Sequence, residues 1–573
     1  MKNYFICTLL FISFFIASSE SEETQIYVAS EILTLNSSNQ VVEAVAVKNS
    51  KIIDAGSVKK LRASFPSATL VLDYQDDVIV PGFIEHHIHP FLAAVTMNSE
   101  IIAIDDWSLA NKVSLGVQNR TDYLKKLGEV EAQHPGRQPL VSWGFHHYFH
   151  GSLTKQDLDA ISPIRPIIVI HRSFHEFILN TPAMKMLNIS SNAFPDLKEE
   201  KHLVNFEEGH FSERGAMVVL PNLMSILAAP QKLIAGLNKT KDYIHENGIT
   251  VIGNPGSMYS QDIQMAKNYT FGNLNTPFES YFFPSALNLS EQFDLSQMLD
   301  AAKQQTSWGA GKVNFLSNHI KLFSDGAMYS QNMMMRDGYL DNHQGSWLMD
   351  DKNYQETFKL FWDADYQIHI HQNGDAALDR ILDTLEENLI NNSKKDHRTT
   401  VVHFGYSAKD QIKRMKDLGV LISANPYYVT ALSDLYSRQG VGPERSQEMV
   451  RLGDAIGAGI MVALHSDMPM APASPLQLMH SAVNRINFAN KVAGPNQRIS
   501  PLEALKAVTI NSAYVLRLEE MHGSIEVGKY ANFTVLQKNP LTVPPVEIKD
   551  IAVVGTVLKG VSYPIRSPLK NTP

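Results

Sequence analysis

The sequence predicts an α/β fold, and two observations lead to this prediction. In the middle of the chain, apolar stretches of strand length alternate with stretches of helical spacing, which is the pattern of a parallel sheet or barrel. Both ends of the chain instead carry short strand candidates separated by Asn, Ser and Gly. The chain has 573 residues, 44% of them hydrophobic, enough for a large core with appended parts.

Eight apolar stretches in the middle of the chain are strand candidates. They are 78–84, 248–253, 278–283, 319–323, 367–371, 399–403, 420–424 and 460–467. We expect them to form a TIM-type (β/α)8 barrel over residues 81–514, with all carboxyl ends at one mouth. A further candidate, 166–170, falls in the long interval before residue 248. About 100–240 is therefore expected to contain an insertion after the first barrel strand. A helix is expected to begin at Ser500, where Ser-Pro-Leu-Glu forms a capping box.

The two ends of the chain are expected to build one small domain together. Strand candidates lie at 26–28, 44–47, 531–536 and 551–557. We predict a small β-sandwich domain made of 20–80 and 515–573.

The first residues resemble an export signal. A short positive start is followed by an apolar run from Tyr4 to Ile16 and by the small residues 17–19. We expect residues 1–19 to be a cleaved signal peptide, because the apolar run is short for a membrane anchor, which is the alternative. The mature protein would then be periplasmic or secreted, without stable membrane insertion. The single cysteine, Cys7, lies inside this signal, so the mature chain has no disulfide, thiolate nucleophile or cysteine ligand.

The charge of the chain limits the kinds of molecule that it is expected to bind. The formal net charge is −9 and no long basic run is present, which argues against nucleic-acid binding. We expect a small-molecule substrate, and a homodimer is compatible with the sequence.

The first strand candidate ends in histidines. His87 and His89 are two residues apart, so in an extended chain they lie on one face and can hold one divalent metal ion. The alternative is a pair of solvated loop histidines. His86 faces the opposite way and is not expected to bind.

Two further strands carry metal-capable residues. Lys321 would point into the barrel, where a bare ammonium is costly. It could be deprotonated, paired with a carboxylate such as Asp325, or carbamylated so that it bridges two metal ions. On the next strand, His371 lies nearer the mouth than His369 and is the better ligand.

The last two candidates are His403 and Asp467, each at a strand end. A carboxylate beside metal-activated water can act as general base, which suits Asp467. His465 lies one step deeper and is a weaker candidate. Together these residues form an ordered series on strands one, four, five, six and eight, which unrelated core histidines would rarely produce.

This series resembles the amidohydrolase superfamily, in particular its YtcJ-like branch, over essentially the whole mature chain. The similar motifs are Pro-Gly-Phe-Ile-Glu-His-His-Ile-His (81–89), Lys-Leu-Phe-Ser-Asp-Gly (321–326), His-Gln-Asn-Gly-Asp (371–375), Ser-Asp-Met-Pro (466–469) and Gly-Ser-Ile-Glu-Val-Gly-Lys-Tyr-Ala-Asn (523–532). Three positions depart from the family's pattern: Glu85 and Asn532 each replace an aspartate, and Val402 stands where an acid is frequent.

The resemblance implies one or two divalent metal ions, expected to be zinc. His87 and His89 would bind one ion, His371 and His403 the other, and carbamylated Lys321 would bridge them. Asp467 would bind the first ion and shuttle a proton as a bridging hydroxide attacks a carbonyl carbon. The expected activity is hydrolysis of carbon–nitrogen bonds other than peptide bonds, in an amide, N-acyl compound or cyclic amide.

Two alternatives stay open. One is a mononuclear hydrolase of an ester or N-acyl amino acid, with unmodified Lys321. The other is a catalytically inactive amidohydrolase-fold interaction protein. Substrate contacts are expected from the insertion, whose basic and aromatic side chains could suit a carboxylate-bearing N-acyl compound, or could equally be packing residues. These are Trp143, His146, His147, His171, Arg172 and His175.

Overall fold

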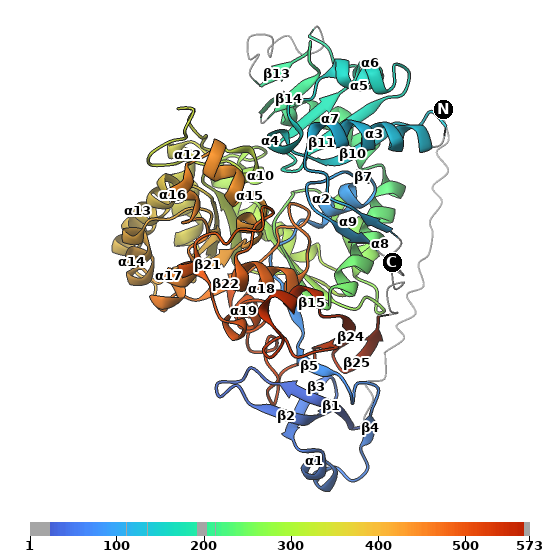
Figure 1. Cartoon of the computed structure of the whole chain (residues 1–573). Helices are drawn as coiled ribbons and strands as arrows, with labels where there is room; N and C mark the ends of the chain where they lie inside the picture. The colour runs from blue at the N-terminus through green and yellow to red at the C-terminus, as the bar shows by residue number, and fades with distance from the viewer. Residues whose placement is uncertain (1–22, 110–111, 135, 192–202, 213, 566–573) are drawn as a thin grey trace, which may run out of the picture.

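The computed structural model describes residues 23–109, 112–134, 136–191, 203–212 and 214–565. Three parts follow one another along the long axis in Figure 1: an insert at the top, a large α/β body in the middle and a β-sheet at the bottom. The expected signal peptide, residues 1–19, lies outside the described residues. Among the residues described, no helix combines the length and apolar character needed to cross a membrane.

The body is built on eight parallel strands, which we call the strand ring. Strands β6, β15 and β16 pair in one sheet, with β17 at its edge, and β18 to β22 pair in order in another. Bridges join the two sheets at both sides, from Ser285 to Lys321 and from Ile88 to Met468. The eight strands therefore follow one another in ring order. Their bounds are β6 (Phe83–Glu85), β15 (Ile249–Ser257), β16 (Glu279–Pro284), β18 (His319–Phe323), β19 (Gln367–Gln372), β20 (Thr400–His403), β21 (Leu421–Ala424) and β22 (Val462–Leu464), with the edge strand β17 at Val313–Phe315.

The single strand expected at 78–84 is in fact two strands. β5 (Val78–Pro81) pairs with β1 and β23 in the sheet at the bottom, whereas β6 starts at Phe83 and pairs with β15. Gly82 makes the change of sheet possible, because a Cβ there would lie 2.1 Å from the Thr250 hydroxyl oxygen. The strand ring thus begins at Phe83.

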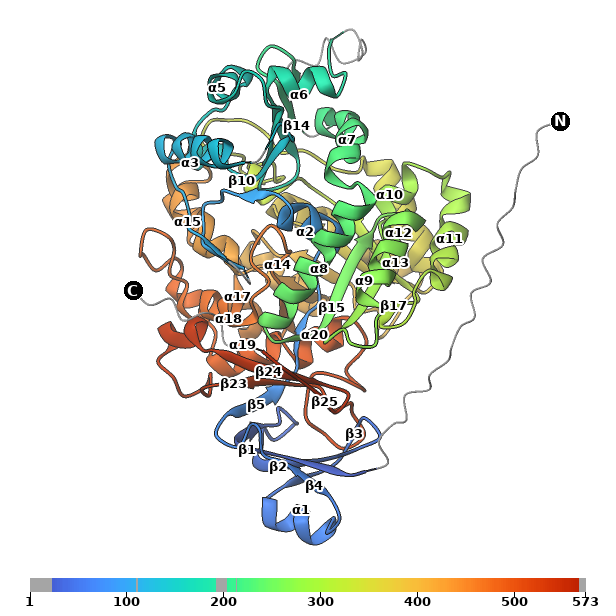
Figure 2. The same ribbon diagram turned by 90° about the vertical axis from the view of Figure 1, so that its right-hand side faces the viewer.

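Helices connect the ring strands and cover them from outside (Figure 2). The helix expected from Ser500 is confirmed: α19 begins with a capping box between Ser500 and Glu503 and has Pro501 in its first turn. The helices of the body are α2 (Pro90–Met97), α8 (Pro230–Glu246), α9 (Gln261–Phe271), α10 (Ala286–Ser290), α11 (Leu295–Gln304), α12 (Asp351–Asp363), α13 (Asp375–Asn391), α14 (Lys409–Asp417), α15 (Tyr427–Gln439), α16 (Pro443–Ser446), α17 (Leu452–Gly457), α18 (Pro475–Asn484), α19 (Pro501–Ala507) and α20 (Ile510–Val515).

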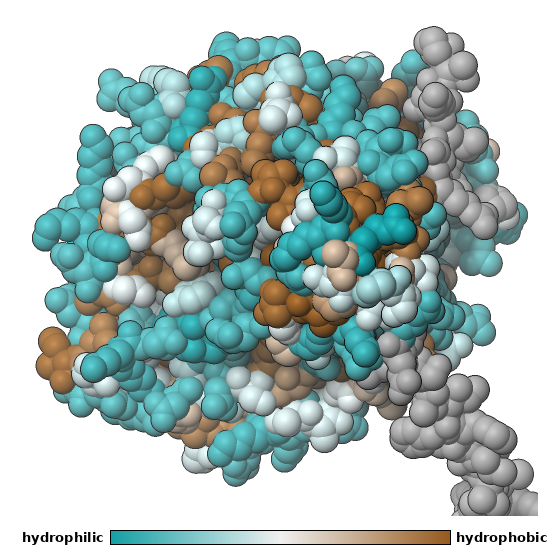
Figure 3. Space-filling model, turned by 90° about the horizontal axis from the view of Figure 1, so that it is seen from below, coloured by the Kyte–Doolittle hydropathy of each residue, from teal (hydrophilic) through white to brown (hydrophobic). Residues whose placement is uncertain are grey.

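Strands from both chain ends share one eight-stranded sheet. Its order is β25-β24-β23-β5-β1-β2-β3, with β4 paired to β1, so β23 from the C-terminal part lies directly beside β5. Seen from this end, the surface is mostly hydrophilic with hydrophobic patches between (Figure 3). The bounds are β1 (Gln25–Leu33), β2 (Val41–Lys48), β3 (Lys51–Gly56), β4 (Thr69–Val71), β23 (Phe533–Leu536), β24 (Val553–Leu558) and β25 (Val561–Pro564), with helix α1 at Val58–Ser64.

The insert between β6 and β15 has a sheet of its own. Its order is β13-β14-β12-β11-β10-β7, and β11 (Ile167–His171) corresponds to the candidate at 166–170. The other elements are β7 (Glu100–Ile101), β8 (Trp107–Leu109), β9 (Lys112–Ser114), α3 (Arg120–Gln133), β10 (Leu140–Phe145), α4 (His147–His150), α5 (Lys155–Ile161), β12 (Glu176–Leu179), α6 (Thr181–Met186), β13 (Val204–Asn205), β14 (His210–Ser212) and α7 (Arg214–Leu227).

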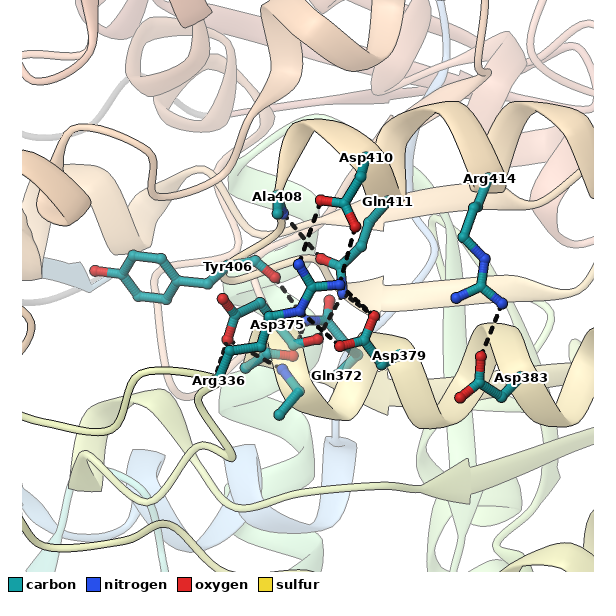
Figure 4. A network of polar contacts seen from close by, with 12 residues as sticks. Arg336, Gln372, Asp375, Asp379, Asp383, Tyr406, Ala408, Asp410, Gln411 and Arg414 are labelled. Carbon is teal, nitrogen blue, oxygen red and sulfur yellow. Dashed lines mark hydrogen bonds and ion pairs between the residues drawn. The ribbon is translucent and has the colours of Figure 1, made fainter.

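An arginine holds the long loop after β18 against the helices of the body (Figure 4). The Arg336 guanidinium donates to Asp379 on α13 at 2.6 Å and to Asp410 on α14 at 3.1 Å. Its backbone N–H donates to the Asp375 carboxylate at 2.8 Å. Asp375, which belongs to one of the family-like motifs, therefore fixes this loop.

Candidate metal centre

The expected ligands lie at or near the carboxyl ends of ring strands. His87 and His89 follow β6, and His89 directly precedes α2. Lys321, His371 and His403 lie in β18, β19 and β20, and Asp467 follows β22. Parallel strands in ring order bring these ends to one mouth.

Asp467 is the centre of the group. Its Oδ1 lies 3.3 Å from Nε2 of His87 and 3.1 Å from Nε2 of His89, and its Oδ2 lies 3.8 Å from Nδ1 of His403. Ligand atoms of His87, His403 and Asp467 all lie within 4.8 Å of one another. Asp467 and His403 have φ angles of 60° and 75°, a conformation that a non-glycine residue adopts only when its surroundings impose it.

His371 and Lys321 border this group. The His371 and His403 rings meet edge to face with centroids 4.5 Å apart, and Asn373 holds Nε2 of His371 at 2.9 Å. The Lys321 side chain is 1% exposed, and its Nζ has no hydrogen-bond partner among the described residues. Burial lowers the pKa of Lys321 to about 7, although the Asp467 charge acts in the opposite direction.

Pairing between Lys321 and Asp325, considered from the sequence, does not occur in this structure. The Asp325 carboxylate accepts hydrogen bonds from the backbone N–H groups of Asn373 at 3.0 Å, Gly374 at 2.8 Å and Met334 at 3.0 Å. Asp325 thus fixes the loops around His371 and leaves Lys321 without a partner.

Burial favours the neutral form of three histidines of the centre, His87, His371 and His403. Burial lowers the pKa of His87, His371 and His403 well below the usual value, and the Lys321 charge lowers each further. Only a neutral imidazole offers a lone pair to a metal ion, so these groups are prepared for ligation.

A chain of hydrogen bonds fixes the tautomer of His403. It starts at Ser512, whose hydroxyl donates to the Ala507 carbonyl at 2.7 Å and therefore accepts from Nδ1–H of His86 at 2.9 Å. Nε2 of His86, which burial keeps neutral, then accepts from the Ser423 hydroxyl at 2.7 Å.

The chain continues from Ser423 to the metal centre. Because its proton is used toward His86, the Ser423 oxygen accepts from Nδ1–H of His465 at 2.9 Å. Nε2 of His465 then accepts from Nδ1–H of His403 at 3.1 Å. We therefore assign the proton of His403 to Nδ1, which leaves the Nε2 lone pair for a metal ion.

Two histidines that were not expected to bind the metal ion, His86 and His369, lie outside the ligand group. His86 does face away from the ligands, but it supports His403 through Ser423 and His465, and sequence reasoning missed this role. His369 lies among core side chains, where its Nε2 meets Nδ1 of His319 at 3.0 Å. This location agrees with the expectation that His371, and not His369, is the better metal ligand.

Glu85, the departure from the family-like motif, lies beneath the centre. Its two carboxylate oxygens accept from the backbone N–H of Ser466 at 3.1 and 3.3 Å. Burial raises the pKa of Glu85 to about 8, so the group holds a proton at neutral pH. It therefore links β6 to the segment that carries Asp467.

Arg172 in the insert is not free to bind an anionic substrate. Its guanidinium is buried and paired with Asp105, with Nη2 3.1 Å from Oδ2, and Tyr427 donates to the same carboxylate oxygen at 2.6 Å. Trp143 is buried against Trp107, with ring centroids 5.3 Å apart. Arg172 thus joins the insert to α15 through Asp105 and Tyr427, whereas Trp143 packs within the insert. Neither side chain supports the expected preference for a carboxylate-bearing substrate.

The family model "Amidohydrolase family" matches residues 71–563. The chain therefore belongs to the amidohydrolase family, as the motifs indicated, and it is an enzyme of the hydrolase class.

Three comparisons illustrate how far the similarity extends. YtcJ of Bacillus subtilis is 24% identical over 553 residues, 92% of this chain and 97% of that protein. The N-substituted formamide deformylase of Arthrobacter pascens is 23% identical over 555 residues, 92% of this chain and 96% of that protein. Among solved structures, a metal-dependent hydrolase from Pyrococcus horikoshii OT3 aligns with a TM-score of 0.70 at 18% identity, covering 91% of this chain and 99% of that one. The similarity to this solved structure shows that the two proteins share a fold.

Proposed function

We propose that this protein is a metal-dependent hydrolase of carbon–nitrogen bonds other than peptide bonds, with an amide, N-acyl compound or cyclic amide as substrate. One observation carries the proposal: imidazoles and a carboxylate from separate strands meet within 4.8 Å at the mouth of the strand ring. We propose further that this ring is a TIM-type barrel and that the terminal strands form a two-layered sandwich.

The residues of the centre fit a divalent metal ion. Nε2 of His87, Oδ1 of Asp467 and Nζ of Lys321 are buried and have no hydrogen-bond partner among the described residues. Buried polar atoms in this state are explained by an ion that they bind. Nitrogen and oxygen ligands of this kind suit zinc. The residues that would hold one or two ions are His87, His89, Lys321, His371, His403 and Asp467.

When bound, the metal supplies Lewis acidity for a substrate carbonyl and lowers the pKa of water. Asp467 takes the proton of the attacking water, since its carboxylate lies between His87 and His89. It then gives this proton to the leaving nitrogen, so that the amine departs neutral. Carbamylated Lys321 would add two oxygen ligands, whereas the unmodified amine would leave a mononuclear site.

The substrate class draws support from one relative. The Arthrobacter pascens protein is named for N-substituted formamides, and it aligns with nearly the whole of this chain. We therefore place N-substituted formamides first among the probes, followed by N-acyl amino acids, cyclic amides and esters.

Purified full-length protein, loaded with zinc in bicarbonate buffer, tests the proposal. We expect one to two equivalents of metal by elemental analysis and amine release from at least one amide probe. Metal binding with turnover of esters alone would support the mononuclear esterase alternative instead. Neither metal binding nor turnover would support the inactive interaction protein, which the presence of the complete ligand set disfavours.

We also propose that the protein is exported and acts in the periplasm or outside the cell, because residues 1–19 have the pattern of a cleavable signal. Cell fractionation of a natively expressed chain, with N-terminal sequencing of the product, tests this. An intact N-terminus in the cytoplasmic fraction would contradict it.

A further inference from the structure

A second group of histidines lies in the insert, apart from the metal centre. His146 follows β10, His147 begins α4, and His171 ends β11. Strands β10 and β11 run parallel with Phe145 opposite His171. The carboxyl ends of two neighbouring strands therefore bring the three imidazoles together. From the sequence alone we expected these side chains to be substrate contacts or packing residues.

The three rings form a nearly equilateral triangle. Ring centroids are 5.3 Å apart for His146 and His171, 5.4 Å for His147 and His171, and 5.7 Å for His146 and His147. One nitrogen of each ring lies within 4.8 Å of the other two. The same criterion brings together His87, His403 and Asp467 in the metal centre.

Several nitrogens of this triangle are buried without a hydrogen bond. His146 and His171 are 0% exposed. Both ring nitrogens of His146, Nδ1 of His147 and Nε2 of His171 have no hydrogen-bond partner among the described residues. A core histidine that serves packing alone normally has its polar atoms paired, so these atoms indicate an ion.

A carboxylate faces two of the three rings. Oε1 of Glu176 lies 3.8 Å from Nδ1 of both His147 and His171. Its Oε2 accepts from Nε2 of His210 at 2.9 Å, which fixes its orientation. Burial raises the pKa of Glu176, and the hydrogen bond from His210 acts in the opposite direction. In metal sites a carboxylate in this place binds the ion or orients its imidazole ligands.

We propose that His146, His147 and His171 bind a divalent transition-metal ion, with the Glu176 carboxylate beside them. Three imidazole ligands suit zinc, cobalt, nickel or copper and disfavour magnesium or calcium, which prefer oxygen ligands. The site lies where the insert meets the loop after β18: the His146 ring is 6.0 Å from that of Tyr329, and the hydroxyls of Ser173 and Ser330 are 3.3 Å apart. An ion there fixes the ends of β10 and β11 where they face the strand ring.

Anomalous X-ray scattering from crystals of the full chain tests this directly. The protein is dialysed against low-micromolar zinc, crystallised without further zinc, and measured on both sides of the zinc edge. We expect an anomalous peak among the three imidazoles, separate from any peak at Asp467. A peak at Asp467 with none in the insert would overturn the proposal. The experiment does not depend on turnover, so it also remains informative if the proposed hydrolase activity is wrong.

Metal counting on a variant gives a second, independent measurement. His146→Ala/His171→Ala should bind about one equivalent of zinc less than the wild type, because three ligands are reduced to one. His134→Ala is the matched control: this histidine caps α3 in the same insert, outside the triangle, and its loss should leave the zinc count unchanged. A circular dichroism spectrum confirms that each variant folds. An unchanged count in the folded double variant would overturn the site, and if that variant fails to fold, the anomalous peak decides.

Discussion

His403 and His465 are joined by a hydrogen bond of 3.1 Å between Nδ1 of the first and Nε2 of the second. Behind them, Ser423, His86 and Ser512 continue the chain to a backbone carbonyl, which fixes the direction of every donor. His403 is thereby held as the tautomer that leaves Nε2 to a metal ion. Imidazole ligands in proteins commonly donate their other N–H to such a partner.

Ser423→Ala should weaken metal binding. The change removes the hydroxyl that is hydrogen-bonded to both His86 and His465. The proton of His403 is then no longer fixed on Nδ1. Loss of an outer partner of this kind costs about 10- to 100-fold in metal affinity. Competition with a chromophoric chelator measures the change. Ser423→Thr keeps the hydroxyl and should restore most of the affinity, and equal affinities in Ser423→Ala and wild type would contradict the proposed support.

Asp467→Asn should abolish hydrolysis while the fold remains intact. An amide cannot take up the proton of water at neutral pH, so the rate constant kcat should fall by about 10²-fold or more. Release of amine from an N-substituted formamide, or from whichever probe the wild type cleaves, measures the effect. Asp341→Asn, at a carboxylate that is 63% exposed, serves as the control. Full activity in Asp467→Asn would rule out this residue as the proton shuttle.

The positions of the ligands could be predicted from the sequence because they follow from two general properties of β-strands. Side chains alternate along a strand, and parallel strands in one ring have their carboxyl ends on the same side. These regularities suffice to choose His371 over His369 as the nearer neighbour of His403, which agrees with the geometry. They also suffice to bring His87 and Asp467 together, although 380 positions separate them in the sequence.

The chain of hydrogen bonds that orients His403 could not be predicted in this way. Ser423 contacts His86 across 337 positions, and a serine at a strand end carries no pattern that indicates its partner. The split between β5 and β6 was missed for a different reason. Both strands are buried and only Gly82 lies between them, so only the close approach of Gly82 to Thr250 marks the change of sheet.

Glu85→Gln should change how stability depends on pH. Burial raises the pKa of Glu85 from 4.5 to about 8, so the folded protein keeps a proton that the unfolded chain releases above about pH 4.5. This group's contribution to the free energy of unfolding therefore falls as the pH rises from about 4.5 to 8. Glutamine cannot titrate, so the variant should be more stable relative to wild type at pH 8 than at pH 5, by an amount on the order of a few kcal/mol.

Urea unfolding of metal-free protein at both pH values measures this difference. Comparing the variant with wild type at each pH cancels the contribution of all other titrating groups, which both proteins share. Parallel pH profiles for the two proteins would show that Glu85 is ionised in the folded state.

Lys321 should form a carbamate, and its formation should increase with pH. Burial lowers the pKa of Lys321 from 10.5 to about 7, so the amine becomes neutral as the pH rises through 7. Only the neutral amine attacks carbon dioxide: its nitrogen forms a bond to the carbon, and one N–H proton leaves to water. In ¹³C-bicarbonate buffer with metal present, we expect a protein-bound carbamate signal by ¹³C NMR at pH 8 that is much weaker at pH 6.

Two substitutions assign that signal. Lys321→Met should remove it and lower the metal content, because the oxygen ligands that a carbamate would supply are lost. Lys267 provides a matched control, because it is also buried, and burial lowers its pKa to about 7, but its Nζ is hydrogen-bonded to Ser257 at 2.9 Å. Lys267→Met should retain the signal. A signal that persists in Lys321→Met, or its absence from metal-loaded wild type at pH 8, would leave Lys321 unmodified and support a mononuclear centre.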